Sequence, residues 1–211
     1  MEVTGILNQA FVGLSRTVIL FIVSSGLSLI LGVLRIPNIA HGSLYMIGAF
    51  MSFTISRVFG GGEMGFWMAL IGAPLTVAII SLFAERGVFQ HLYEREHLML
   101  LLLTFAFSLI VGDLVKIIWG GEYKSVPVPH TFQGFVPLIG GLPFPTYNIF
   151  LLVCGPIIAI LLWLLVNKTK IGKISQAAAV DREMVGAVGI NVSWVFAIVF
   201  VIGCLLAGLG G

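Results

Sequence analysis

Long apolar stretches, separated by short polar connections or by proline and glycine, make up most of the 211-residue chain. A helix needs about 20 mostly apolar residues to cross the hydrocarbon core of a bilayer, because each residue rises only about 1.5 Å. Backbone polar groups must also be satisfied within the membrane, which favours helices. By these criteria the sequence predicts six spans, at residues 12–34, 39–57, 64–83, 98–118, 148–166 and 195–211.

Proline and glycine mark the connections between these spans. Pro37 lies between the first two, three glycines at 60–62 lie between the second and third, and five of the eight prolines fall within 119–147. We expect a single all-α, polytopic transmembrane bundle over residues 1–211, with the 119–147 connection folded over one mouth of it. The last span runs into Gly211, so we also expect this span to be cut short and further spans to follow in a longer protein.

The composition excludes a water-soluble globule. Hydrophobic residues make up 59% of the chain and charged residues only 9%, with a mean hydropathy of +1.11, which leaves too little polar surface to face water. The net charge of +2 gives no reason to expect a nucleic-acid partner. Cys154 and Cys204 both lie in apolar runs, so they are interpreted as small hydrophobic residues. The chain has no basic segment before its first apolar stretch, so that stretch is expected to be retained.

Lysine and arginine near the ends of the spans predict the orientation, because these residues are retained on the cytoplasmic side. With the loop 167–194 inside, alternation of the spans places seven basic residues inside and four outside. We therefore expect the N-terminus and the 119–147 connection outside. The basic residues of the cytoplasmic loop are Lys168, Lys170, Lys173 and Arg182.

The cytoplasmic loop itself predicts a short helix. Residues 175–188 are rich in alanine and contain no proline, and Gly189 follows as a C-terminal cap. The consecutive residues Ala177, Ala178 and Ala179 offer a small, smooth surface to a partner protein. The alternative is an ordinary interfacial helix that lies on the lipid headgroups.

Three stretches, in this order, resemble the permease subunits of bacterial branched-chain amino acid ABC transporters. They are RIPNIAHGSLYMIGAF at 35–50, the pair Glu85-Arg86 leading to LLLLTFAFSLIVGDLVKIIWG, and TKIGKISQAAAVDREMVGAVGINV at 169–192. The most specific matches are the Asn-x-Ala-His-Gly run at 38–42 and the Asp-Arg-Glu that precedes Gly-Ile-Asn at 189–191.

This resemblance implies an importer of leucine, isoleucine or valine in the bacterial inner membrane, working by alternating access. It implies a second permease subunit, two cytoplasmic ATPase subunits that bind ATP and Mg²⁺, and a soluble substrate-binding protein on the outer face. The chain has no G-x-x-x-x-G-K-[ST] motif, so it is not expected to be an enzyme or to hold a cofactor. The helix that the resemblance assigns to ATPase coupling contains Ser175, Gln176, Ala177, Ala178, Ala179, Asp181, Arg182, Glu183, Gly186, Gly189 and Ile190.

Asn38, His41 and Gly42 lie just after Pro37, at the inner end of the second span. Asn38 is expected to cap this helix, His41 to form a hydrogen bond within the bundle, and Gly42 to allow a neighbouring helix to approach closely. The alternative is that the run lines the translocation path. The structural interpretation is favoured.

Two further patterns have chemical interpretations. Asp113 and Lys116 share one helical face in the fourth span, where they either meet the two charges of an amino acid or satisfy one another. Glu94 and His97 have the E-x-x-H spacing of carboxylate-bridged metal sites, but the chain offers one copy of that pattern and no metal is expected. The alternative functions are a permease for urea or short amides, an ion-coupled transporter that uses Asp113, and a membrane scaffold.

Overall fold

The computed structural model describes residues 3–34, 38–92, 97–137 and 143–211. Its α-helices in these residues are α1 (Val3–Leu34), α2 (His41–Val58), α3 (Gly62–Gly87), α4 (His97–Trp119), α5 (Thr146–Lys168), α6 (Lys170–Val180), α7 (Arg182–Ala187) and α8 (Val192–Gly210). Two 3₁₀ turns, η1 (Phe89–Leu92) and η2 (His130–Phe132), and two short strands, β1 (Phe135–Pro137) and β2 (Pro143–Pro145), complete the described structure.

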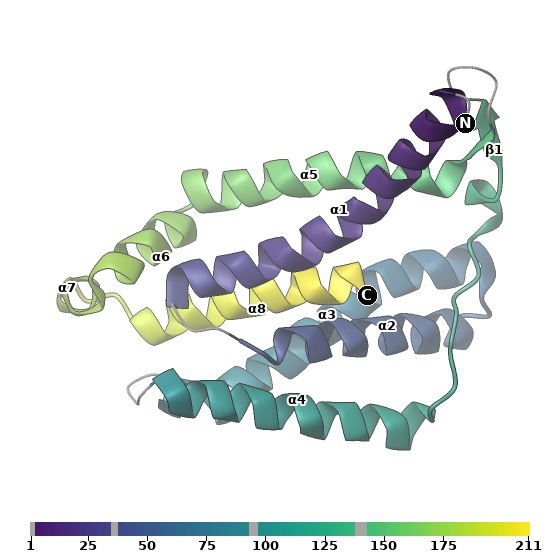
Figure 1. Cartoon of the computed structure of the whole chain (residues 1–211). Helices are drawn as coiled ribbons and strands as arrows, with labels where there is room; N and C mark the ends of the chain where they lie inside the picture. The colour runs from purple at the N-terminus through teal and green to yellow at the C-terminus, as the bar shows by residue number, and fades with distance from the viewer. Residues whose placement is uncertain (1–2, 35–37, 93–96, 138–142) are drawn as a thin grey trace.

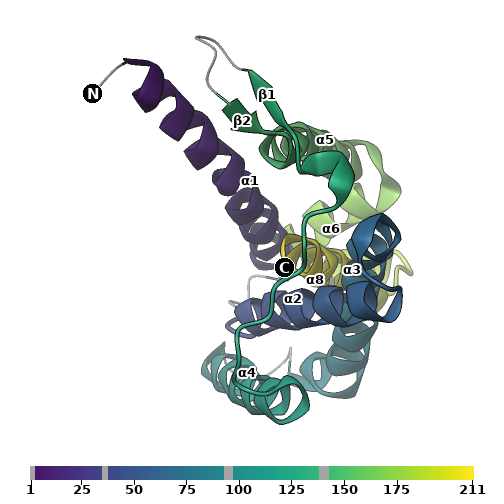
Figure 2. The same ribbon diagram turned by 90° about the vertical axis from the view of Figure 1, so that its right-hand side faces the viewer.

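The six long helices lie side by side, and the chain connects them alternately at two ends of the bundle (Figure 1). One end carries α6 and α7 and is called the α7 end below. The other carries the N-terminus, β1 and β2 and is called the hairpin end (Figure 2). All six predicted spans are therefore helical, and the prediction of an all-α bundle is confirmed.

Five of the six long helices are long and apolar enough to cross a membrane, within the residues that the structure describes. The exception is α2, which has only 18 residues and carries Ser43, Ser52, Thr54, Ser56 and Arg57. Several of its residues are buried against the neighbouring helices. In Figure 1, α2 begins part-way along the bundle, beside α8, and ends at the hairpin end, where α3 begins.

The helix α8 occupies the centre of the bundle, where it packs against α1, α2 and α3. Glycine makes this packing close. A Cβ atom on Gly203 of α8 would lie 2.6 Å from Ile30 Cγ1 of α1, and one on Gly48 of α2 would lie 2.7 Å from Gly208 Cα of α8. Side chains have no room at these crossings, which is the usual device for close helix packing in membranes.

The connection between α4 and α5 folds against the hairpin end, as predicted. Strands β1 and β2 pair antiparallel, and the Thr131 backbone N–H donates to Glu63 Oε1 of α3 at 3.1 Å. Phe144 of β2 is fully buried, with its ring centroid 6.1 Å from that of Phe11 in α1. A cluster of aromatic rings joins the connection to α3 and α5, and its members are Phe66, Trp67, Phe132, Tyr147 and Phe150.

Candidate functional site

The helices α6 and α7 project from the bundle beyond the end of α5 (Figure 1). Each begins with a side-chain cap. Thr169 Oγ1 accepts from the Gly172 N–H at 3.0 Å, and Asp181 Oδ1 accepts from the Met184 N–H at 2.9 Å. The prediction of one helix over 175–188 is therefore wrong. Asp181 interrupts it with extended backbone angles of φ −142° and ψ 99°, because its carboxylate satisfies a backbone donor of α7 in place of a carbonyl of α6.

The attachment of α6 to α5 gives Gln176 a structural role. The Gln176 side-chain amide donates to the Val166 carbonyl at 3.0 Å. Gly172 is buried beneath the last turn of α5, where a Cβ atom would collide with the Leu165 and Val166 carbonyl oxygens. The Gln176 side chain thus holds α6 in place.

One face of α6 is buried in the bundle and the other is exposed. Ser175 and Ala178 are 3% and 4% exposed, and α6 contacts both α1 and α8. Ala177 is exposed and Ala179 is half-buried. The expected surface of three alanines is therefore wrong for Ala178, because the helical period of 3.6 places residues 175 and 178 together on the face that meets the bundle.

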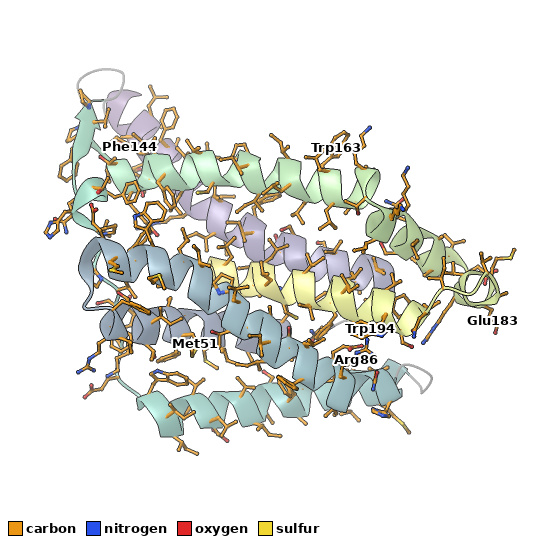
Figure 3. All side chains as sticks on the ribbon, turned by 180° about the vertical axis from the view of Figure 1, so that it is seen from behind. Met51, Arg86, Phe144, Trp163, Glu183 and Trp194 are labelled. Carbon is orange, nitrogen blue, oxygen red and sulfur yellow. The ribbon has the colours of Figure 1, made fainter. Side chains whose placement is uncertain are left out.

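Apolar side chains gather instead where α6 meets α7. Val180, Met184 and Val188 are 81%, 65% and 75% exposed, and we call these three residues the α7 tip. Exposed Asp181 and Glu183 lie among them, and Glu183 points away from the bundle (Figure 3). The spacing of four residues between Met184 and Val188 was the sequence signal for this surface, and it was missed. Exposed apolar side chains with a polar rim are typical of protein interaction sites.

The connection from α7 to α8 is short and well defined. Gly189 has φ +86° and its N–H donates to the Gly186 carbonyl at 2.9 Å, which confirms the predicted glycine cap. Ile190 packs against the hydrophobic core, and Asn191 Oδ1 accepts from the Trp194 N–H at 3.2 Å. A displacement of α7 therefore reaches α8 through only four residues, 188–191.

The run at 38–42 differs from the prediction in two respects. The N-cap of α2 is Ala40, and Asn38 contributes only its backbone carbonyl, which accepts from the His41 N–H at 3.2 Å. Gly42 is exposed, and a Cβ atom there would have no neighbour within 4 Å. The expected Asn38 cap and the expected close approach at Gly42 are both wrong. The close approach occurs at Gly48, which faces α8.

His41 makes the hydrogen bond that was predicted, from Nε2 to the Val23 carbonyl of α1 at 3.0 Å. Both Asn38 and His41 are buried. The Asn38 amide and His41 Nδ1 have no hydrogen-bond partner among the described residues. Their place in a translocation path stays a prediction.

Asp113 and Lys116 form an ion pair of 3.4 Å on α4, with side chains that are 74% and 72% exposed. The pair satisfies itself on the outside of the bundle, and none of the other predicted site residues lies with it. An ion-coupled mechanism that places Asp113 in a buried path finds no support in this position. Glu94 and the side chain of His97 lie outside the described residues. In the described part of the chain, no group of three His, Cys, Asp or Glu side chains is placed to hold a metal ion.

Comparisons with known proteins agree with this architecture. The family described as "Branched-chain amino acid transport system / permease component" matches residues 9–211. The permease protein BraD of a high-affinity branched-chain amino acid transport system from Pseudomonas aeruginosa is 24% identical over 99% of this chain and 70% of its own length. LivH from Escherichia coli, described in the same terms, is 24% identical over 97% of this chain and 69% of its own length.

No solved structure matches the chain significantly. The family match, in contrast, covers α1 from residue 9 onward and every later helix and strand. The chain therefore belongs to the family of branched-chain amino acid transport system permease components.

Proposed function

We propose that this chain is the transmembrane permease subunit of an ATP-driven importer of branched-chain amino acids in the bacterial inner membrane. The family match over residues 9–211 carries this proposal. The names of BraD and LivH support the substrate class. Transport proceeds by alternating access, in which the bundle opens its path to one side of the membrane at a time.

The ATPase subunits dock on the α7 tip. Val180, Met184 and Val188 support this assignment, because this chain leaves them exposed at the end of a projecting helix pair. Acidic Asp181 and Glu183 stand among them, whereas an interfacial helix is rich in lysine and arginine on its polar face. A protein partner therefore fits this surface better than lipid headgroups. ATP and Mg²⁺ bind to the partner subunits.

The α7 end faces the cytoplasm and the N-terminus lies outside. Lys168, Lys170 and Lys173 support this orientation, because lysine is retained on the cytoplasmic side near the ends of spans. Alternation then places the hairpin end outside, where it receives a soluble substrate-binding protein. A second permease subunit completes the transmembrane part of the complex.

Reconstitution tests the proposal. The chain is co-purified with its partner permease, ATPase and binding protein and placed in liposomes, and uptake of radiolabelled leucine, valine and urea is measured with and without ATP. We expect ATP-dependent uptake of leucine and valine and none of urea. Accumulation of urea without leucine would overturn the substrate, and uptake that follows an ion gradient without ATP would overturn the class.

A further inference from the structure

Arg86 joins three elements at the α7 end of the bundle. The Arg86 guanidinium carbon lies 3.9 Å from the centroid of the Trp194 ring in α8. Its Nε lies 3.6 Å from Glu85 Oε2, and its Nη1 donates to Gln90 Oε1 of η1 at 3.4 Å. Arg86 and Trp194 approach one another from α3 and α8 in Figure 3.

The surroundings of Arg86 hold its side chain in one place. Glu85 is fully buried, and the Arg86 side chain is only 29% exposed. Gln90 Nε2 also donates to the Arg86 carbonyl at 2.5 Å, which fixes the backbone at the end of α3. The helix dipole stabilises any basic residue in the last turn of a helix. That interaction needs no aromatic partner, so it does not explain why the Arg86 guanidinium stacks on Trp194.

A second arginine contacts the same turn of α8 from the other direction. Arg182, the first residue of α7, lies with its guanidinium carbon 5.1 Å from the Phe196 ring centroid. Trp194 and Phe196 are two residues apart, so their side chains leave the helix on nearly opposite sides. The first five residues of α8 are thus contacted by an arginine from α7 on one side and an arginine from α3 on the other.

The rest of α3 packs closely along α8. A Cβ atom on Gly208 of α8 would lie 2.8 Å from Val77 Cβ of α3, and the ring of Phe89 in η1, just after α3, lies 5.6 Å from that of Phe200 in α8. The two helices therefore already form one packed pair inside the bundle. The Arg86–Trp194 contact extends this pair to the turn of α8 that is joined to α7.

We propose that Arg86 is a positioning residue, which ties α3 to the first turn of α8 so that a displacement of α7 moves both helices together. The proposal rests on the proposed function, because the displacement of α7 comes from the ATPase. Loss of the tie lets α7 and α8 move while α3 lags behind. ATP is then hydrolysed with less substrate moved for each ATP.

The test measures leucine taken up for each ATP hydrolysed by the reconstituted complex. The variants are Arg86→Gln, Trp194→Leu, the double variant and the conservative Arg86→Lys. We expect each of the first two to lower this ratio by roughly threefold to tenfold, the range expected for a partly buried cation–π contact, and Arg86→Lys to lower it less. The double variant should lose no more than the worse single variant, because both changes remove one interaction.

The matched control is Lys168→Gln, which removes a cation–π contact within the single helix α5, where Lys168 Nζ lies 5.5 Å from the Trp163 ring centroid. It should leave the ratio unchanged, and ATPase association should be unchanged in every variant. An unchanged ratio in an intact Arg86→Gln complex would overturn the proposal, as would additive losses in the double variant. Trp194 is 53% exposed, so Trp194→Leu is expected to fold even where Arg86→Gln does not.

A measurement without transport separates this inference from the proposed function. Hydrogen exchange of the purified permease reports how firmly the first turn of α8 is held. Arg86→Gln and Trp194→Leu should both accelerate exchange at residues 194–197, and Lys168→Gln should not. A wild-type complex that takes up none of the three substrates would overturn the proposed function alone, whereas unaltered exchange would overturn the tie.

Discussion

The connecting segments are held by different interactions at the two ends of the bundle. At the hairpin end, Phe144 is fully buried and aromatic rings from three elements pack on one another. At the α7 end, the side-chain caps Thr169 and Asp181 and the Gln176 amide hold the connecting helices, and Met184 stays 65% exposed. The connection at the hairpin end is thus packed within this chain, while the α7 tip keeps its apolar side chains exposed.

The same difference predicts that the connection at the hairpin end is held more firmly than α7. Aromatic packing at the hairpin end joins the connection to α1, α3 and α5 at once. The short helix α7, in contrast, is held between Asp181 and Gly189, at positions where the backbone already departs from helical angles. Segments with few buried apolar contacts are the ones that move most easily.

The largest expected effect is at the hairpin end. Phe144→Ala removes a buried ring and should lower the free energy of unfolding by about 3–5 kcal/mol. Thermal unfolding of the purified permease measures this change. Phe135→Ala provides the matched control, because Phe135 is 67% exposed and its loss should change stability little. Equal effects of the two changes would show that the connection is not packed as described.

A charge introduced into α6 tests the difference between its buried and its exposed face. Ala178→Arg places an unpaired cation in the hydrophobic core and should destabilise the permease by about 3 kcal/mol or more. Ala177→Arg places the same charge on the exposed face of α6 and should leave thermal unfolding unchanged. Normal stability of Ala178→Arg would contradict the docking of α6 against the bundle.

Removal of the α7 cap has a smaller effect. Asp181→Ala takes away the acceptor for the Met184 N–H and should cost about 1 kcal/mol of local stability. Faster hydrogen exchange confined to residues 183–186 is the expected result. The control is Glu183→Gln. It removes a negative charge two residues after Asp181 and leaves the cap intact. Exchange that is equally slow in both variants would remove Asp181 as the cause of the break between α6 and α7.

The smallest effect belongs to the exposed ion pair of α4. Asp113→Asn combined with Lys116→Gln should leave leucine uptake within about tenfold of the wild type and the substrate preference unaltered, because an exposed pair contributes little. Competition of valine and urea against radiolabelled leucine measures the preference. A changed order of preference would show that the pair contacts the substrate.

The hydrophobic pattern predicted the six long helices, because helices that must satisfy their own backbone groups in a membrane leave a length and composition signal. Gly189 was also predictable, since a glycine after an alanine-rich helix favours a left-handed cap. These features depend on local chemistry and on the bilayer.

Features that depend on packing were not predictable in the same way. The sequence does not say which face of α6 meets the bundle, so it does not distinguish buried Ala178 from exposed Ala177. Gly42 and Gly48 look alike in the sequence, and only the position of α8 decides that Gly48 takes the close approach. The contact of Arg86 with Trp194 joins residues over a hundred positions apart, and no local sequence pattern predicts it.

The most direct test of the account compares the two ends in one experiment. A photo-crosslinking residue is placed at Met184 in the α7 tip or at Phe135 in β1, and the assembled transporter is irradiated in native membranes. We predict that position 184 crosslinks to the ATPase subunit and that position 135 does not. Crosslinking of position 135 to the ATPase, or of position 184 to lipid alone, would contradict both the docking site and the orientation.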